Sequence, residues 1–207
     1  MEENIAILMA DLSGYTALTE THGPASAADL IEKYVEIVLD CLVGDCELKE
    51  RTGDEVMIVS LSPDLLLSTA IMIQRNTSNQ DNFLQVHGGL HYGTVLKRNN
   101  SYFGSTINLA SRIAASATPG VFWCSGDFVE ALTDKSNYAF EPKGRHRFKN
   151  INQEKEIVEL VNTRTHELLI DPVCRMLILD KTAAIQHPEK PGIFFCSSAC
   201  LDTFKKE

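Results

Sequence analysis

The sequence predicts an α/β (α+β) fold, in which helices pack on one face of a mixed or antiparallel sheet. The apolar run at residues 4–10 is short and has no helical gaps, as expected for a buried strand. Apolar residues at helical spacing follow within residues 26–42, after a capping-box pattern at Ser26–Asp29. Strand-like and helix-like stretches then continue in the order two strands, helix, strand, which favours a layered α/β sandwich.

The individual elements follow from local patterns. Thr52, Gly53 and Asp54 separate two strand-like runs and indicate a hairpin. Pro63 at a first helical position and Pro119-Gly120 after a last one mark helix ends. We expect strands at 4–10, 46–51, 55–60, 83–92, 94–97, 121–124, 140–148 and 156–161. We expect helices at 26–42, 62–75, 105–117 and 127–132.

Composition limits the class of protein. The chain has 207 residues, of which 44% are hydrophobic, enough for one large core and a small accessory unit. Its net charge of −9 argues against a nucleic-acid partner and against an anionic membrane surface. The first apolar run is too short for a signal peptide or a membrane span, so we expect a cytoplasmic protein. We place a domain boundary near residue 165, giving units at 1–165 and 166–207.

Two carboxylates are predicted at neighbouring strand ends. Asp11 ends the first strand and Asp54 lies in the hairpin turn. If these strands pair, both side chains project from one edge of the sheet and suit Mg²⁺ or Mn²⁺. The turn at Ser13–Thr16, with Gly14, Tyr15 and Thr16, could present backbone N–H groups to a phosphate. The alternative is that both aspartates only form turns, which is a common use of Asp.

A helix after residue 104 carries a second pair of polar residues. Asn108 and Arg112 are four residues apart, so they share one helix face. Such a pair can hold a phosphoryl group in its transition state, although an arginine on an exposed helix is usually only solvated.

Five motifs in this order resemble the class III adenylate and guanylate cyclase catalytic domain over about residues 3–162. They are Met9–Thr16, Thr52–Met57, His87–Gly93, Tyr102–Arg112 and Gly144–Lys149. The resemblance implies a ferredoxin-like core and a head-to-tail homodimer with active sites at the interface. It implies an enzyme, a phosphorus–oxygen lyase of cyclic nucleotide signalling, that converts ATP or GTP to the 3′,5′-cyclic nucleotide and pyrophosphate.

The same resemblance assigns roles to residues. Asp11 and Asp54 would hold two Mg²⁺ or Mn²⁺ ions on one subunit. The partner would supply Asn108 to orient the ribose, Arg112 to neutralise charge on the α-phosphate, and Lys149 to bind the terminal phosphates. Positioning and charge stabilisation would suffice for this chemistry.

The nucleotide base is the point at which the sequence departs from the family. Adenylate cyclases generally carry Lys four residues before the second metal Asp, and Glu50 stands there. An ionised carboxylate accepts from the N–H groups of guanine, so Glu50 favours GTP, unless it only balances Lys49 or Arg51. Lys49 is adjacent, but in an unbroken strand it would point to the opposite face. Ser101, at the second base-reading position, suits either base.

The tail from Asp171 carries three of the six cysteines, and in a cytosolic chain we expect no structural disulfides. Cys174, Cys196 and Cys200 could bind a soft metal such as Zn²⁺ or Cu, with His187 as a candidate fourth ligand. The opening Asp-Pro-Val-Cys, the aromatic strand and the Cys-x₃-Cys resemble a YHS domain, although Arg175 stands where that family usually has Gly. Inert buried cysteines are the alternative.

Two other functions compete with a cyclase. The chain could be a catalytically silent cyclase-like module that binds nucleotide or dimerises without turnover. It could also store metal through its tail, which would be wasteful for so large a carrier. The joint presence of both aspartates with Asn108, Arg112 and Lys149 favours the enzyme.

Overall fold

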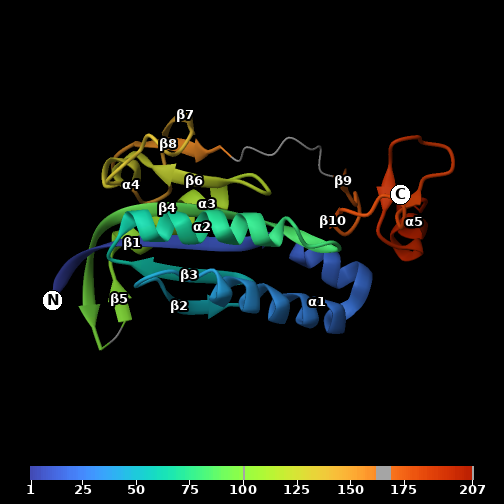
Figure 1. The fold of residues 1–207 in the computed structure, drawn as a ribbon, viewed down its shortest axis with the longest axis horizontal. Helices are drawn as coiled ribbons and strands as arrows, with labels where there is room; N and C mark the ends of the chain where they lie inside the picture. Colours follow the sequence, from blue (N-terminus) through green and yellow to red (C-terminus); the bar gives the residue numbers. More distant parts are fainter. Residues whose placement is uncertain (100, 162–168, 207) are drawn as a thin grey trace.

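The structure, a computed structural model, describes residues 1–99, 101–161 and 169–206. The described chain forms a large mixed sheet flanked by helices, and a small C-terminal segment, residues 169–206, at one end (Figure 1). Its helices are α1 (Tyr15–Asp40), α2 (Pro63–Thr77), α3 (Ser105–Ser116), α4 (Gly126–Glu130) and α5 (Ser198–Phe204). None of the helices described is long and apolar enough to cross a bilayer.

Most strands up to residue 160 agree with the sequence-based expectations, but the strands expected at 83–92 and 94–97 form one strand, and the short strand Ser101–Phe103 was not expected. The strands are β1 (Glu2–Ser13), β2 (Glu47–Thr52), β3 (Glu55–Ser60), β4 (Phe83–Arg98), β5 (Ser101–Phe103), β6 (Phe122–Ser125), β7 (Phe140–His146) and β8 (Lys155–Leu160). The C-terminal segment adds β9 (Leu169–Ile170), β10 (Met176–Ile178), β11 (Ile185–Gln186) and β12 (Phe194–Phe195).

The sheet order places the predicted site at one edge. The main path is β2-β3-β1-β4-β6-β8-β7, in which only β4 and β6 run parallel. Strand β1 lies between β3 and β4, and it pairs with β4 from Glu2 to Ser13 and with β3 from Ala6 to Ala10. The expected hairpin is present, because Thr52 pairs with Glu55 across the turn at Gly53 and Asp54. The end of β1 and this turn therefore meet at the same edge of the sheet.

Helices cover both faces of the sheet, which corrects the expectation of helices on one face. Alternate β1 residues such as Leu8 pack with α1 and α2, whereas the intervening residues Ile5, Ile7 and Met9 pack with α3. We call these the α1 face and the α3 face. A Cβ built on Gly89 of β4 would lie 2.6 Å from the Ala110 carbonyl oxygen, so α3 lies directly on the sheet. Only glycine permits this approach.

Helix α1 begins at Tyr15, eleven residues before the expected start at Ser26. Gly23 has a φ of 82° and a ψ of 168°, and Pro24 follows it, so the helix is kinked there. The first segment, Tyr15–His22, is therefore a separate helical piece that follows the Ser13–Thr16 turn.

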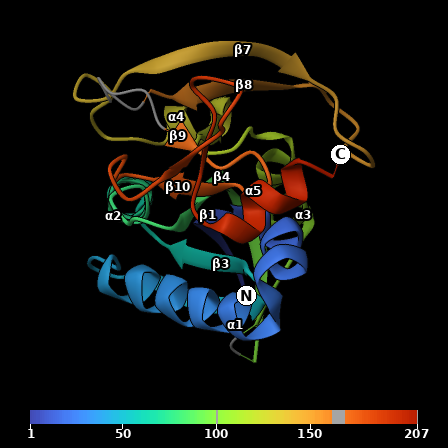
Figure 2. The same ribbon diagram turned by 90° about the vertical axis from the view of Figure 1, so that its right-hand side faces the viewer.

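The C-terminal segment is attached to the sheet at the start of β4. Strand β10 pairs with β4 through Met176 with Leu84 and Leu177 with Phe83. Figure 2 shows this segment in front of the sheet, beside the start of α1. The domain boundary predicted near residue 165 lies outside the described residues.

Candidate functional site

Asp11 and Asp54 lie side by side, as their positions at neighbouring strand ends predicted. Their carboxyl groups are close enough to share a hydrogen bond when one of them is protonated. Burial, this hydrogen bond and the charge of Asp11 together raise the pKa of Asp54 to about 6. Two carboxylates that repel one another at neutral pH form a site that a divalent cation would stabilise.

Two further residues, His87 and Tyr34, lie near this acidic pair and were not singled out as site residues from the sequence. His87 is opposite Asp11 in the β1–β4 ladder, and its Nδ1 lies 2.9 Å from the Ser13 Oγ. Burial lowers the pKa of His87, so it is neutral at pH 7. The Tyr34 hydroxyl from α1 has no hydrogen-bond partner among the described residues. Burial raises the pKa of Tyr34, and the charges of the nearby aspartates raise it further.

The Ser13–Thr16 turn leads directly into α1. Gly14 has a φ of 96°, a left-handed conformation that favours glycine, and it occupies the N-cap position. As a glycine, Gly14 has no side chain that could cap the helix, and the first turn contains no acidic residue. Tyr15 and Thr16 begin the helix beside Asp11. The first N–H groups of a helix and the positive end of its dipole favour an anion at this position.

Asn108 and Arg112 lie on the exposed side of α3, and Lys149 lies in the exposed loop between β7 and β8. Within the described residues, neither Arg112 nor Lys149 forms an ion pair, and none of the three is hydrogen-bonded to Asp11 or Asp54. One chain therefore brings the two aspartates together but does not join them to the cationic residues.

A β-bulge in β2 corrects the expected direction of Lys49 relative to Glu50. The register shifts between Leu48 and Glu50, so that Glu50 lies opposite Met57, a residue of the α3 face. The Lys49 Nζ lies 2.7 Å from Glu47 and 5.7 Å from the centre of the Tyr102 ring, also on the α3 face. A bulge places two consecutive side chains on the same side of a sheet. Lys49 and Glu50 therefore share the α3 face.

Ser101, the second predicted base-reading residue, begins β5 and is exposed. It pairs with Arg98, and its neighbour Tyr102 is the aromatic ring approached by Lys49. The predicted base-reading positions thus lie on two elements that meet at Tyr102.

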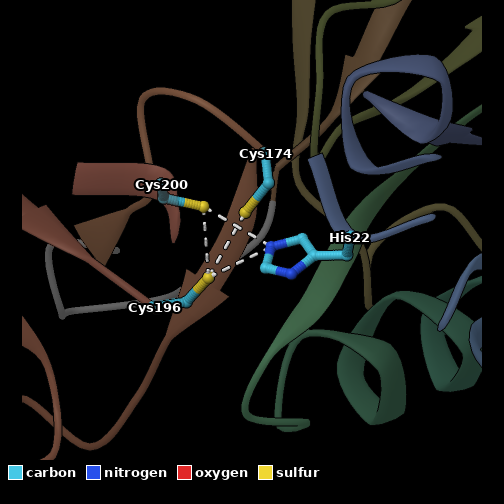
Figure 3. A group of neighbouring side chains, drawn as sticks. All are labelled: His22, Cys174, Cys196 and Cys200. Carbon is cyan, nitrogen blue, oxygen red and sulfur yellow. Dashed lines mark hydrogen bonds between the residues drawn. The ribbon is translucent and has the colours of Figure 1, made fainter. Parts of the chain in front are cut away.

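The three tail cysteines come together as predicted, but the nearby histidine is His22 of α1. His187 is held elsewhere: its Nδ1 accepts hydrogen bonds from the Glu189 and Lys190 N–H groups. We call His22, Cys174, Cys196 and Cys200 the Cys₃His cluster (Figure 3). The fourth member, His22, belongs to α1 and precedes Cys174 by more than 150 residues in the sequence.

Comparison with protein families identifies the larger part of the chain. Residues 1–162 match the model of the adenylate and guanylate cyclase catalytic domain. The chain belongs to this family. The fold class and the general enzyme class expected from the five motifs are therefore confirmed at the level of the family.

Relatives of this cyclase chain include proteins of Mycobacterium tuberculosis. An uncharacterised protein of strain H37Rv is 39% identical over 134 residues, covering 64% of this chain and 35% of the relative. A pH-sensitive adenylate cyclase of strain CDC 1551 is 28% identical over 130 residues, covering 63% of this chain and 33% of the relative. The chain thus matches about a third of the length of these relatives.

Solved cyclase structures share the fold. The adenylyl cyclase CyaB of P. aeruginosa superimposes with a TM-score of 0.66 at 16% identity. The match covers 80% of this chain and 97% of that chain. At this identity the likeness establishes the architecture of the cyclase core.

Proposed function

We propose that the chain converts ATP to 3′,5′-cyclic AMP and pyrophosphate. The observation that carries the proposal is the adjacent Asp11 and Asp54 pair in a chain of the cyclase family. When bound, two Mg²⁺ or Mn²⁺ ions would promote ionisation of the ribose 3′-hydroxyl and neutralise the triphosphate. Both aspartates would hold these ions, and the Ser13–Thr16 turn with Gly14, Tyr15 and Thr16 would hold phosphate oxygens through its N–H groups.

The remaining polar residues would neutralise charge on the substrate and fix its orientation. In the reaction, a bond forms between O3′ and the α-phosphorus, the bond to pyrophosphate breaks, and the 3′-hydroxyl proton passes to solvent. Arg112 would stabilise the charge that develops on the α-phosphate, Asn108 would orient the ribose, and Lys149 would hold the terminal phosphates. These groups do not meet the aspartates within one chain, so we propose that a second copy supplies them in a homodimer.

The β2 bulge supports ATP as the substrate. Adenine has an acceptor at N1 and an amino donor at N6, which an ammonium and a carboxylate on one face can serve together. Lys49 and Glu50 provide this pair, and Ser101 can accept from or donate to the base. Several named relatives, such as the pH-sensitive enzyme, are adenylate cyclases. We therefore propose ATP as the substrate, in place of the GTP preference predicted from Glu50 alone.

The substrate is tested by product analysis. Purified protein is incubated with ATP or GTP and Mn²⁺ or Mg²⁺, and the products are identified by mass spectrometry. We expect cyclic AMP from ATP, and we expect Lys49→Met to lower kcat/KM for ATP about tenfold or more, the cost of one charge-assisted hydrogen bond. Arg51→Met, which removes a positive charge from the next exposed position, is the control. Preferential cyclisation of GTP by the wild type would contradict this assignment.

The shared site is tested by mixing two inactive variants. Asp54→Asn and Arg112→Ala each remove one half of the site, and Arg112→Ala should cost about 10²–10³-fold in kcat. Random mixing of subunits would restore one intact site in half of the dimers, or about a quarter of wild-type activity. No recovery after exchange of subunits, verified with differently tagged chains, would place all the groups in one subunit and reject the dimer.

A further inference from the structure

The Cys₃His cluster joins the C-terminal segment to the first piece of α1. The Cys196 Sγ lies 3.4 Å from the Cys174 Sγ and 3.7 Å from the Cys200 Sγ. The His22 Nε2 lies 3.6 Å from the Cys196 Sγ and 3.4 Å from the Cys200 Sγ. All four ligand atoms lie within 4.8 Å of one another, and Figure 3 shows them pointing toward a common centre.

A buried carboxylate holds two of the cysteine-bearing loops together. Asp171 is fully buried, and its Oδ1 accepts hydrogen bonds from the Val173 and Cys174 N–H groups at 2.8 and 3.2 Å. Its Oδ2 accepts from the Cys196 N–H at 2.8 Å. The Ser197 hydroxyl caps α5 by accepting from the Cys200 N–H. The three sulfur atoms are therefore positioned by the fold and do not meet by chance on a mobile surface.

The spacing of the ligand atoms agrees with a tetrahedral metal site. With Zn–S bonds of about 2.3 Å and Zn–N bonds of about 2.0–2.1 Å, tetrahedral angles give about 3.8 Å between sulfurs and about 3.5 Å between sulfur and nitrogen. The sulfur–sulfur distances of 3.4 and 3.7 Å and the sulfur–nitrogen distances of 3.6 and 3.4 Å lie close to these values. The remaining pairs lie within 4.8 Å. A disulfide would bring two sulfurs to about 2.05 Å, and all six cysteines are free.

We propose that the Cys₃His cluster binds one zinc ion, and that the cyclase helix α1 supplies the fourth ligand to a site otherwise built by the C-terminal segment. Three thiolates and one imidazole in a tetrahedral arrangement suit Zn²⁺, and no position is left open for catalysis. The site is structural. It goes beyond the proposed cyclase reaction and does not depend on it.

The site connects the tail to the segment that follows Asp11. His22 lies just before the kink at Gly23, at the end of the short helical piece that starts at the Ser13–Thr16 turn. At the other end of this piece, a Cβ built on Gly14 would lie 2.6 Å from the Arg175 Cβ, so the tail contacts the turn closely. Zinc would connect His22, at one end of this piece, to Cys174, whose neighbour Arg175 contacts Gly14 at the other end. It would thereby stabilise the turn beside the aspartates.

Metal content tests the site directly. Full-length protein is equilibrated with Zn²⁺, passed through a desalting column and analysed for metal, and its affinity is measured by competition with a chromophoric chelator. We expect one zinc ion per wild-type chain, and at least a roughly hundredfold weaker affinity in His22→Ala, since loss of even an outer-shell partner can cost about 10–100-fold. His187→Gln, which alters the histidine outside the cluster, and Cys46→Ser should each retain wild-type affinity.

A second variant keeps the test valid if His22→Ala does not fold. His22→Cys converts the cluster to four thiolates and should still bind one ion. Loaded with Co²⁺, the wild type should show the visible bands of a tetrahedral thiolate site, and His22→Cys should gain sulfur-to-cobalt charge-transfer intensity. A wild-type chain that binds no zinc, or equal affinity in His22→Ala, would overturn the proposal. So would an unchanged cobalt spectrum in His22→Cys. None of these readouts uses cyclase turnover, so failure of the zinc site is separate from failure of the proposed reaction.

Discussion

The central sheet and the C-terminal segment hold their functional side chains in different ways. Strand β1 is paired along all twelve residues with β4 and packs apolar side chains on both faces, which places Asp11 at its end. In the C-terminal segment, β11 and β12 pair at two positions only. There the buried Asp171 and the cysteines form the main internal connections. Long ladders fix a site through apolar burial, whereas a small segment needs polar and metal connections.

The largest effect is expected from the sheet core. Leu8 is fully buried between Ile58 and Leu90 in the neighbouring strands. Leu8→Ala should lower the free energy of unfolding by about 3–4 kcal/mol, because it removes buried methyl groups and leaves a cavity. Chemical denaturation followed by circular dichroism measures this change. Leu39→Ala, on an α1 side chain that is 50% exposed, should change the free energy by less than about 0.5 kcal/mol. Similar losses in both variants would refute the apolar account of the sheet.

An intermediate effect is expected from the polar connection in the tail. Asp171→Asn should destabilise the C-terminal segment by about 2 kcal/mol, because an amide group cannot accept all three N–H hydrogen bonds. Hydrogen exchange should become faster at residues 169–206 and stay unchanged in β1 and β3. Asp202→Asn, on the exposed side of α5, is the matched control. Equal acceleration in the central sheet would mean that the two regions unfold as one unit, and the contrast between them would fail.

The smallest effect is expected at the acidic pair, where a substitution should raise the free energy of unfolding and not lower it. The pKa of Asp54 rises from 3.8 in the unfolded chain to about 6 in the folded protein. The folded state therefore binds more protons, and metal-free stability falls as pH rises through about 6. Asp54→Asn should be more stable than the wild type by about 1 kcal/mol at pH 8 and should lose this advantage toward pH 4, after a discount for partial exposure.

Thermal unfolding in EDTA at pH 4, 5 and 8 measures this difference. Asp29→Asn removes the same charge from an exposed position on α1 and serves as the control. Added Mn²⁺ should stabilise the wild type and leave Asp54→Asn unchanged. A variant that is less stable than the wild type at pH 8 in EDTA would show that the aspartates do not repel one another.

Local patterns predicted most of the strands and the hairpin at Thr52–Asp54, because a hairpin determines its own register. The meeting of Asp11 with Asp54 was expected only if the first strand pairs with this hairpin, which it does. The helix at 105–117 was equally local, since its apolar spacing and the Pro119-Gly120 stop lie within one segment. The placement of α3 on the opposite face was not predictable this way, because helical spacing gives the apolar side of a helix but not the sheet face that it covers.

The sequence-based predictions failed at three places. At two of them a single residue interrupts the regular helix or strand pattern, and at the third the residues in contact are far apart in the sequence. The helical piece Tyr15–His22 was not predicted, because the helix was expected to start only at Ser26, beyond the kink at Gly23. The β2 bulge turned Glu50 to the side of Lys49, and no composition signal marks it. His22 and Cys196 meet only because α1 and the tail pack together, so the nearer His187 was chosen instead. These features depend on tertiary packing, which a single sequence does not specify by pattern alone.

The bulge in β2 also has a consequence for how substrate choice could change over time. Lys49 is the extra residue between Leu48 and Glu50, and it interrupts the alternation of side chains along β2. Its deletion would restore a continuous alternation. Such a shortened strand would present a single charged group to the nucleotide base in place of two of opposite sign. A length change of one codon could therefore switch base preference without any substitution in the metal-binding or phosphate-binding residues.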